Sequence, residues 1–201
     1  MTLRWDTTIK RLLQEGVLGS LVQVDIRGVS GQHANSSTLM HWRNDYELSG
    51  SNTMTLGIYY EALRRWVGSA TRVTAMASNV VKQRANAAGE LAAVRIPDHL
   101  EVLGRLAFDG AQLHMMISDV VAGGGRPAAE IWLHGTSADL HLDLTQKKLT
   151  LYRITPSGER IGSDVDVPDH AAGSWRVEEE FIGAIRGQEK ITHTRCDPLS
   201  L

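Results

Sequence analysis

The sequence predicts an α+β fold, with an open, mainly antiparallel (mixed) β-sheet that carries its helices on one face. Three observations predict it. Residues 5–67 hold two segments of helical period around a short strand, residues 70–167 repeat a period of two, and residues 175–186 return to a helical period. Strands joined by short turns pair antiparallel, and the flanking helices cover one face. We expect one domain over residues 1–187 and an irregular tail over residues 188–201.

A helix is expected over residues 5–15 and a strand over residues 20–28. Asp6 suits the N-cap of this helix, and Gly16 and Gly19 end it. The apolar face of the helix consists of Ile9, Leu12 and Leu13. Apolar and polar side chains alternate in the strand, which predicts one buried and one wet face. The apolar set is Val22, Val24 and Ile26, and the polar set is Gln23, Asp25 and Arg27.

Residues 28–48 show no periodicity and collect glycine, serine, asparagine and histidine, which predicts a long loop. Long loops in compact domains are often functional. A helix follows from about Asn52 to Val67, with Ser49 and Ser51 as candidate N-caps. Its apolar stripe consists of Leu56, Tyr60, Leu63 and Val67.

The period of two that begins at residue 70 indicates a meander of strands. Its segments read ATRVTAMAS, LEVLGRLAF, AQLHMMISD, AEIWLHG, ADLHLDL, KLTLYRI and ERIGSDVDV. Asp109-Gly110 predicts a tight hairpin turn, and three glycines at residues 123–125 predict another turn. Residues 175–186 have the spacing of a final helix.

One face of this sheet carries side chains that are unusual for contact with water, because tryptophan and methionine stand beside histidine. We expect this open face to pack on a second copy of the chain, giving a dimer or tetramer. The expected interface residues are His114, Met116, Trp132, His134 and His141. A metal site is the alternative for the histidines, but it needs three ligands converging on one point. We expect no bound metal.

The charge balance and the cysteine content limit the classes of function. The 21 basic and 23 acidic residues give a net charge of −2, so no basic field exists to bind nucleic acid or anionic lipid. A single cysteine, Cys196, makes neither a disulfide framework nor a CxxC metal site. The sequence shows no signal peptide and no apolar run near the roughly 20 residues of a membrane span. We expect a cytoplasmic protein with no nucleic-acid or membrane partner.

Two stretches resemble a known family. EGVLGSLVQVDIRG, followed by WRNDYELSGSNTMTLGIYYEALRRWVGSATRVTAMAS, is similar to the opening of the C-terminal domain of the Gfo/Idh/MocA oxidoreductases. There, a helix ending in G-x-[IL]-G and a strand precede the motifs WR, elsGGG and DxGxHxxDxxrwlxG. The motifs occur here in the same order and spacing, over residues 4 to 120. The implied fold is that of the dihydrodipicolinate reductase and glucose–fructose oxidoreductase C-terminal domains.

The resemblance implies a two-part protein. In the family, an N-terminal Rossmann domain binds NAD or NADP, and the C-terminal domain forms one wall of the substrate cleft and, through its sheet, the oligomer interface. No strand–GxGxxG–helix unit occurs in these 201 residues, so we expect this chain to bind no cofactor. Its implied partners are the missing Rossmann domain, a second copy and a small-molecule substrate that resembles a sugar or polyol. NAD or NADP is implied for the full-length protein.

The acid–base motif of the family is altered in this sequence. Thr55 and Tyr59 stand where the family has the Asp and His of DxGxHxxD, and Ala62 replaces the later Asp. A histidine suits a general base at neutral pH, whereas a threonine does not. A tyrosine, with a pKa of about 10, serves only if its surroundings lower that pKa. We expect Thr55 and Tyr59 in the catalytic position, on one helical face, and half-buried packing is the alternative.

Three further residues are expected to bind substrate: Asn52, Arg43 and Trp42. Asn52 precedes Thr55 by one helical turn, Arg43 suits a hydroxylated or anionic group, and Trp42 offers an aromatic face to a sugar ring. The alternative for Trp42 and Arg43 is that they anchor an ordered loop.

Two functions of different classes remain open. The first is the substrate-binding and oligomerisation half of an NAD(P)-dependent oxidoreductase, inactive alone. The second is a stand-alone, non-catalytic module for dimerisation or small-ligand binding. The loss of the Asp and His favours the second function, and the polar loop and helix favour the first. Fold alone does not decide between them.

Overall fold

The computed structural model describes residues 3–51, 53, 55–121, 129–168, 172–173 and 177–188. The helices of this part of the chain are α1 (Asp6–Gln14), the 3-10 turn η1 (Trp42–Asn44), α2 (Tyr46–Ser49), α3 (Leu56–Val67) and α4 (Val177–Ile185). Its strands are β1 (Leu21–Val29), β2 (Ala70–Ser78), β3 (Gln83–Ala85), β4 (Leu91–Ala93), β5 (His99–Leu106), β6 (Gln112–Ser118), β7 (Ala129–Gly135), β8 (Asp139–Asp143), β9 (Lys148–Ile154) and β10 (Arg160–Asp164).

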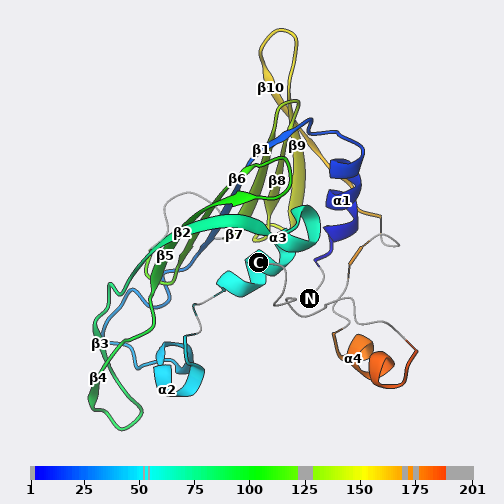
Figure 1. Cartoon of the computed structure of the whole chain (residues 1–201). Coiled ribbons are helices and arrows are strands. Elements are labelled where there is room, and N and C mark those ends of the chain that lie inside the picture. The colour runs from blue at the N-terminus through cyan, green and yellow to red at the C-terminus, as the bar shows by residue number, and fades with distance from the viewer. Residues whose placement is uncertain are drawn as a thin grey trace.

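Eight of these strands form one twisted sheet in the order β10-β9-β8-β7-β1-β6-β5-β2 (Figure 1). Every neighbouring pair is antiparallel except β1 and β6, which run parallel. β1 lies between β6 and β7, although it precedes them by a long stretch of chain. The mixed, mainly antiparallel sheet predicted from the sequence is therefore confirmed. The parallel pair also brings the C-terminal ends of β1 and β6 to the same edge.

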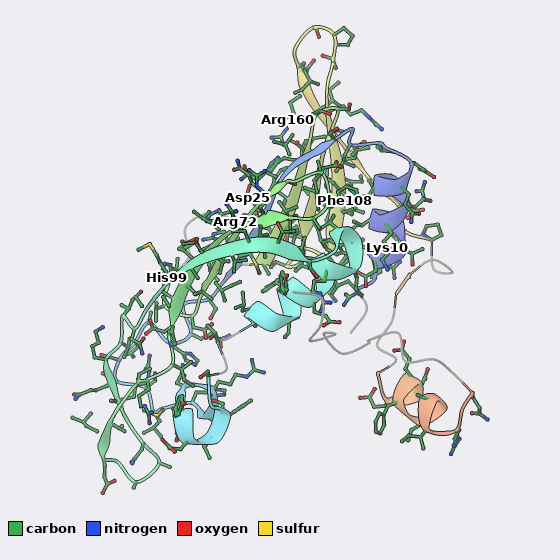
Figure 2. The ribbon with its side chains drawn as sticks, viewed as in Figure 1. Lys10, Asp25, Arg72, His99, Phe108 and Arg160 are labelled. Carbon is green, nitrogen blue, oxygen red and sulfur yellow. The ribbon has the colours of Figure 1, made fainter. Side chains whose placement is uncertain are left out.

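The helices α1 and α3 cover one face of this sheet (Figure 1), as the sequence predicts. The core lies between them and the inward side chains of the central strands, and its members include Ile9, Leu63, Trp66, Val24, Ile26, Met115, Ile131, Leu133, Leu140 and Leu142. The opposite surface, which we call the far face, carries the alternate side chains of the same strands. Figure 2 shows Asp25 and Arg160 on that side, away from Lys10 of α1.

Asp6 joins the two helices, and this differs from the capping role that the sequence suggests. Trp5 is the N-cap of α1, and Asp6 is the first helical residue. The buried Asp6 carboxylate accepts hydrogen bonds from Trp66 Nε1 at 2.8 Å and Arg65 Nε at 3.0 Å, both on α3. It also accepts the backbone N–H of Leu3 at 3.0 Å. This tertiary role needs α3 in place and is invisible in the local sequence.

The order of helix, strand, loop, helix and strands follows the prediction, but several details differ. The alternation in β1 breaks at an irregularity between Leu21 and Gln23, so Leu21 is buried and Val22 is exposed. The predicted loop contains η1 and α2, and Ser49 belongs to α2 instead of capping the next helix. The prediction missed β3 and β4, which are three residues each and lack a readable period.

The ends of the predicted elements were less accurate than their existence. Helix α3 begins at Leu56, with Thr55 as its N-cap, instead of near residue 52. The Asp109-Gly110 turn is confirmed, because both residues have positive φ, at 53° and 62°. The turn predicted at residues 123–125, the residue Asn52 and most of the predicted tail lie outside the described residues.

Candidate functional site

A polar cleft of about 490 Å³ opens beside the C-terminal ends of β1 and β6. Parallel neighbours end at the same edge of a sheet, so the loops that follow them meet there. The pairing continues past the strands, because Ser30 N donates to Ser118 O at 2.7 Å and His33 N donates to Asp119 O at 2.9 Å. The cleft is lined by Gly28, Val29, Ser30, Gln32, His33, His41, Trp42, Arg43, Thr55, Tyr59, Asp119 and Ala129.

Four of the five predicted catalytic and substrate-binding residues line this one cleft: Thr55, Tyr59, Trp42 and Arg43. They come from the start of α3 and from η1, which are separate in the sequence. The fifth residue, Asn52, lies outside the described residues. The Arg43 guanidinium carbon lies 5.0 Å from the centre of the Trp42 ring, and Trp42 remains half exposed. The cleft therefore has an aromatic surface with a positive charge beside it.

Tyr59 lies against the backbone of β1 at Gly28. A Cβ atom at Gly28 would come within 2.4 Å of Tyr59 Cε2, so only glycine allows the ring to approach this closely. Burial raises the pKa of the Tyr59 hydroxyl. The surroundings thus do the opposite of what a tyrosine base requires, and Tyr59 keeps its proton at neutral pH. It suits a hydrogen-bond donor to a ligand oxygen, and it does not suit a proton acceptor.

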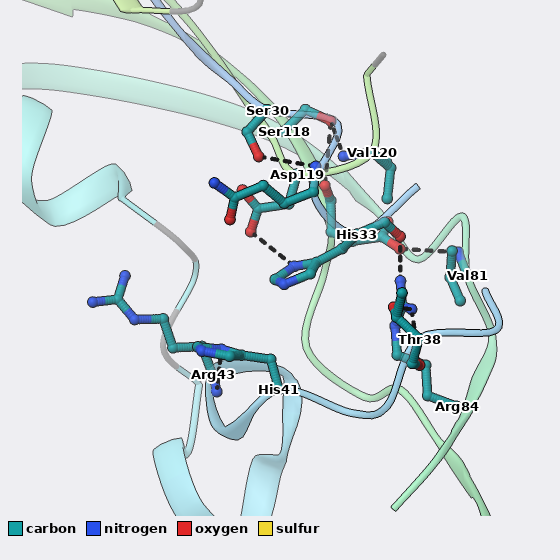
Figure 3. Close-up of polar contacts among 12 residues, drawn as sticks. Ser30, His33, Thr38, His41, Arg43, Val81, Arg84, Ser118, Asp119 and Val120 are labelled. Atoms are coloured by element: carbon teal, nitrogen blue, oxygen red, sulfur yellow. Dashed lines mark hydrogen bonds and ion pairs between the residues drawn. The ribbon is translucent and has the colours of Figure 1, made fainter. Parts of the chain in front are cut away.

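The structure adds two histidines and an aspartate that the sequence analysis did not select for the cleft (Figure 3). His33 Nδ1 lies 3.5 Å from a carboxylate oxygen of Asp119. His41 lies with its ring centre 5.6 Å from that of His33, and its Nδ1 accepts the backbone N–H of Arg43 at 3.3 Å. The one sequence signal was position: His33 and Asp119 each follow a strand closely. Nothing local indicates that these two strands are parallel neighbours.

A buried arginine supports the loop that carries His33. Arg84, on β3, is 1% exposed. Its guanidinium donates to the carbonyl oxygen of His33, to Asn35 O at 2.7 Å and to Thr38 Oγ1 at 2.7 Å (Figure 3). The small β3–β4 hairpin thereby fixes the backbone of the loop that follows β1, because Nη1 and Nη2 of Arg84 both donate to that loop.

The far face of the sheet carries a second polar arrangement, a chain of alternating carboxylates and imidazoles. His114 bridges Glu101 at 2.9 Å and Asp25 at 3.0 Å. His134 bridges Asp25 at 3.4 Å and Asp139 at 3.2 Å. An imidazole between two carboxylates needs both N–H groups and is therefore favoured as a cation.

The pKa values along this chain shift as that geometry requires. The hydrogen bond to Asp25 raises the pKa of His134 against the effect of burial, and Asp139 adds to the rise. Partial burial acts to lower the pKa of His114, but the hydrogen bonds to Glu101 and Asp25 outweigh it and raise that pKa. The hydrogen bond from His134 holds the pKa of Asp25 below its usual value. The raised pKa values of His114 and His134 and the lowered pKa of Asp25 both favour the ion-paired form of these contacts.

All five residues that the sequence assigns to an oligomer interface belong to β6, β7 and β8 of the far face. The Trp132 ring stacks on His141, with centres 3.9 Å apart, and on His134, with centres 5.5 Å apart. Contacts within the face thus occupy part of the aromatic surface. Leu103 and Met76, farther along the same face, are 60% and 76% exposed.

Neither a cluster of metal-ligating side chains nor a dinucleotide-binding turn is found among the described residues. No group of three histidine, cysteine or acidic side chains converges among them as a metal site would require. Within residues 3–121, no glycine-rich turn connects a strand directly to a helix, which is the arrangement that holds a dinucleotide phosphate. No helix in the described part of the chain is long and apolar enough to cross a membrane.

Comparison with known proteins gives a family match and a set of structural matches. The profile described as the GFO/IDH/MocA C-terminal domain matches residues 7–141. A search of curated protein sequences found no match.

Several solved structures share the fold. A levoglucosan dehydrogenase in complex with NADH and L-sorbose superposes with a TM-score of 0.77 at 17% identity, over 95% of this chain and 57% of that one. An NAD-binding oxidoreductase from Klebsiella pneumoniae gives a TM-score of 0.69 at 21% identity, over 81% and 44%. The super-repressor mutant of Gal80p from Saccharomyces cerevisiae gives 0.68 at 18% identity, over 95% and 51%. The chain spans about half the length of these structures.

Proposed function

This chain belongs to the GFO/IDH/MocA C-terminal domain family, and from that premise we propose that it is the substrate-binding and oligomerisation half of an NAD(P)-dependent oxidoreductase, inactive alone. The substrate class that we propose is a sugar or polyol-like molecule. The observation that carries the proposal is the polar cleft, where residues from β1, η1, α3 and the segment after β6 meet.

The composition of the cleft fits a ligand rich in hydroxyl groups. Such a ligand needs many short-range donors and acceptors and one flat apolar surface. Trp42 supplies the flat surface, half exposed beside the Arg43 guanidinium. Tyr59 and Thr55 supply hydroxyl groups, and the Tyr59 hydroxyl stays protonated because burial raises its pKa. The L-sorbose complex of the levoglucosan dehydrogenase, a protein of the same fold, supports this substrate class.

The nicotinamide cofactor belongs to another part of the proposed protein. NADH is bound by structural relatives of this chain in a Rossmann domain that this chain lacks. In the proposal, the dinucleotide is held by that domain. In the proposal, the residues of this chain bind and orient the substrate and handle its hydroxyl proton.

A second candidate function is a non-catalytic module for dimerisation or ligand binding. Two observations favour it. Thr55 and Tyr59 replace an acid–base pair, and the raised pKa of Tyr59 argues against its use as a base. The same fold also occurs in Gal80p, which is described as a transcriptional regulator in its form from a second yeast. If this function is correct, the cleft should bind a polyol and the polyol should not be oxidised.

The proposed oxidoreductase activity can be tested on the protein with its cofactor half present. We expect oxidation of at least one sugar or polyol in a panel assayed with NAD and NADP, and no turnover by the 201-residue chain alone. Tyr59→Phe should lower kcat/KM by about 10- to 1,000-fold, because it removes one donor from the cleft. The free energy of unfolding should change by less than about 1.5 kcal/mol. Unchanged turnover and affinity in Tyr59→Phe would leave Tyr59 a packing residue only.

The proposed oligomerisation through the far face has a separate test. We expect the unaltered chain to form a dimer or tetramer and Trp132→Glu to be a monomer in light scattering. The substitution places a carboxylate beside Glu130 and removes the aromatic surface stacked on His141. Gln14→Glu, at an exposed position of α1 on the other side of the sheet, adds the same charge, is the control and should keep the oligomer. A stable interface between two copies buries more than about 1,000 Å², and we expect the far face to form one. An unaltered chain that is a monomer at micromolar concentration would contradict the proposal.

A further inference from the structure

We propose that His33, oriented by Asp119, is the group that takes up and returns the proton of a ligand hydroxyl in the polar cleft. This inference rests on the proposed function, because it assumes a polyol or sugar as the ligand. It places proton transfer on the loop after β1 and the end of β6, away from the start of α3 where Thr55 and Tyr59 lie.

The placement of the two side chains supports the assignment. His33 Nδ1 is buried, and among the described residues its closest acidic partner is the Asp119 carboxylate at 3.5 Å. With the ring proton on Nδ1 facing that carboxylate, Nε2 keeps its lone pair and can accept a hydrogen bond. Both residues line the cleft. The contact is long for a hydrogen bond, so a small movement on ligand binding would complete it.

Asp119 is a partly buried carboxyl with two cationic or potentially cationic neighbours, His33 and Arg43. Burial raises the pKa of the Asp119 carboxyl, whereas His33 and Arg43 act to lower it. A positive charge that forms beside this carboxylate offsets part of its cost of burial. When His33 accepts a proton at Nε2, the imidazolium that results is paired with Asp119 at once. A histidine and an acid in this arrangement suit reversible proton uptake.

Two other polar side chains of the cleft, His41 and Tyr59, are placed as hydrogen-bond donors. His41 Nδ1 already accepts the backbone N–H of Arg43 at 3.3 Å, so a neutral His41 carries its proton on Nε2 and donates. Tyr59 keeps its proton because its pKa is raised. A ligand hydroxyl bound here can thus donate to His33 and accept from Tyr59 or His41.

The proposed step moves a proton only. The ligand O–H bond breaks and an N–H bond forms at His33 Nε2, and the electron pair of the O–H bond stays on oxygen. The negative charge on that oxygen is met by the Tyr59 hydroxyl and the Arg43 guanidinium, both of which line the cleft. The reverse step returns the proton to the ligand.

The test begins with the unaltered 201-residue chain and three probes: levoglucosan, L-sorbose and xylitol. Long-range ¹H–¹⁵N spectra of the histidine rings report which nitrogen carries the proton. We expect His33 in the Nδ1–H form, a shift of its Nε2 resonance with at least one probe, and a weaker preference for Nδ1–H in Asp119→Asn. His33→Gln should weaken probe binding about tenfold or more. His99→Gln, outside the cleft, is the matched control and should bind like the unaltered chain.

The outcomes separate this inference from the proposed function. His33 in the Nε2–H form, or equal binding by His33→Gln and His99→Gln, overturns the inference even if the full-length protein oxidises a polyol. Turnover by the full-length protein that survives His33→Gln also overturns it. If the probes bind, His33 responds and no polyol is oxidised, the proposed function fails and the inference stands. If no probe binds the unaltered chain, the inference fails, and turnover by the full-length protein still decides the proposed function. The ring spectra of the unaltered chain need no variant, so a poorly folded variant cannot decide the result.

Discussion

Replacing Asp6 with alanine is expected to lower the free energy of unfolding by about 3–5 kcal/mol, because it leaves a half-satisfied charge and an unpaired indole N–H in the core. Asp6 is 5% exposed and connects α1 to Arg65 and Trp66 of α3. The Arg65 side chain is 14% exposed, and Glu61 remains near it at 3.4 Å. The effect should therefore fall toward the lower end of that range.

Urea unfolding followed by tryptophan fluorescence measures this effect, with equal m-values as the condition for comparing midpoints. Glu15→Ala is the matched control, because it removes an exposed carboxylate that pairs with Arg11 at 2.8 Å on the same helix. That variant should cost less than about 0.5 kcal/mol. A loss below about 1 kcal/mol in Asp6→Ala would mean that α1 is held to α3 by apolar packing alone.

The periodic parts of the fold were predictable from the sequence, and the reason is burial. Strands such as β6 bury one face only, so Leu113 and Met115 alternate with Gln112 and His114. The helix α3 shows its buried side at Leu63 and Val67 for the same reason. The three-residue strands β3 and β4 bury too little to leave a pattern. Asp6 was misread as a cap because its partners lie about 60 residues away.

The candidate site was only half predictable. Thr55, Tyr59, Trp42 and Arg43 were selected through a family resemblance, and the structure brings all four to one cleft. His33 and Asp119 were not, because their proximity depends on the parallel pairing of β1 with β6. The residues of β1 would show the same alternation of apolar and polar side chains if β1 lay at the edge of the sheet. The local sequence therefore does not indicate which strands are its neighbours. Long-range strand order is set by the sum of many packing contacts and by the long connection between the strands.

Arg84→Met is expected to disorganise the loop that follows β1 and to lower the free energy of unfolding by about 3 kcal/mol, since the carbonyl oxygens of His33 and Asn35 lose their partly buried guanidinium donor. Arg84 is 1% exposed, and its guanidinium contacts His33, Asn35 and Thr38. Methionine keeps much of the volume but supplies no donor. The loop should then open locally at a lower free energy than the sheet.

Amide hydrogen exchange and probe binding together identify this effect. The amides of His33 and Thr38 should exchange about tenfold or more faster in Arg84→Met than in the unaltered chain. The affinity of the cleft for the probes should also fall. The amides of β7 and β8 should keep the protection against exchange that they have in the unaltered chain. Arg95→Met is the matched control, because Arg95 is exposed and pairs with Glu47 at 2.8 Å. That pair should contribute less than about 1 kcal/mol.

If Arg84→Met loosens the loop but leaves probe affinity intact, the cleft does not depend on the position of His33. If both measurements stay unchanged, the carbonyl groups find other donors and Arg84 is not the residue that fixes the loop.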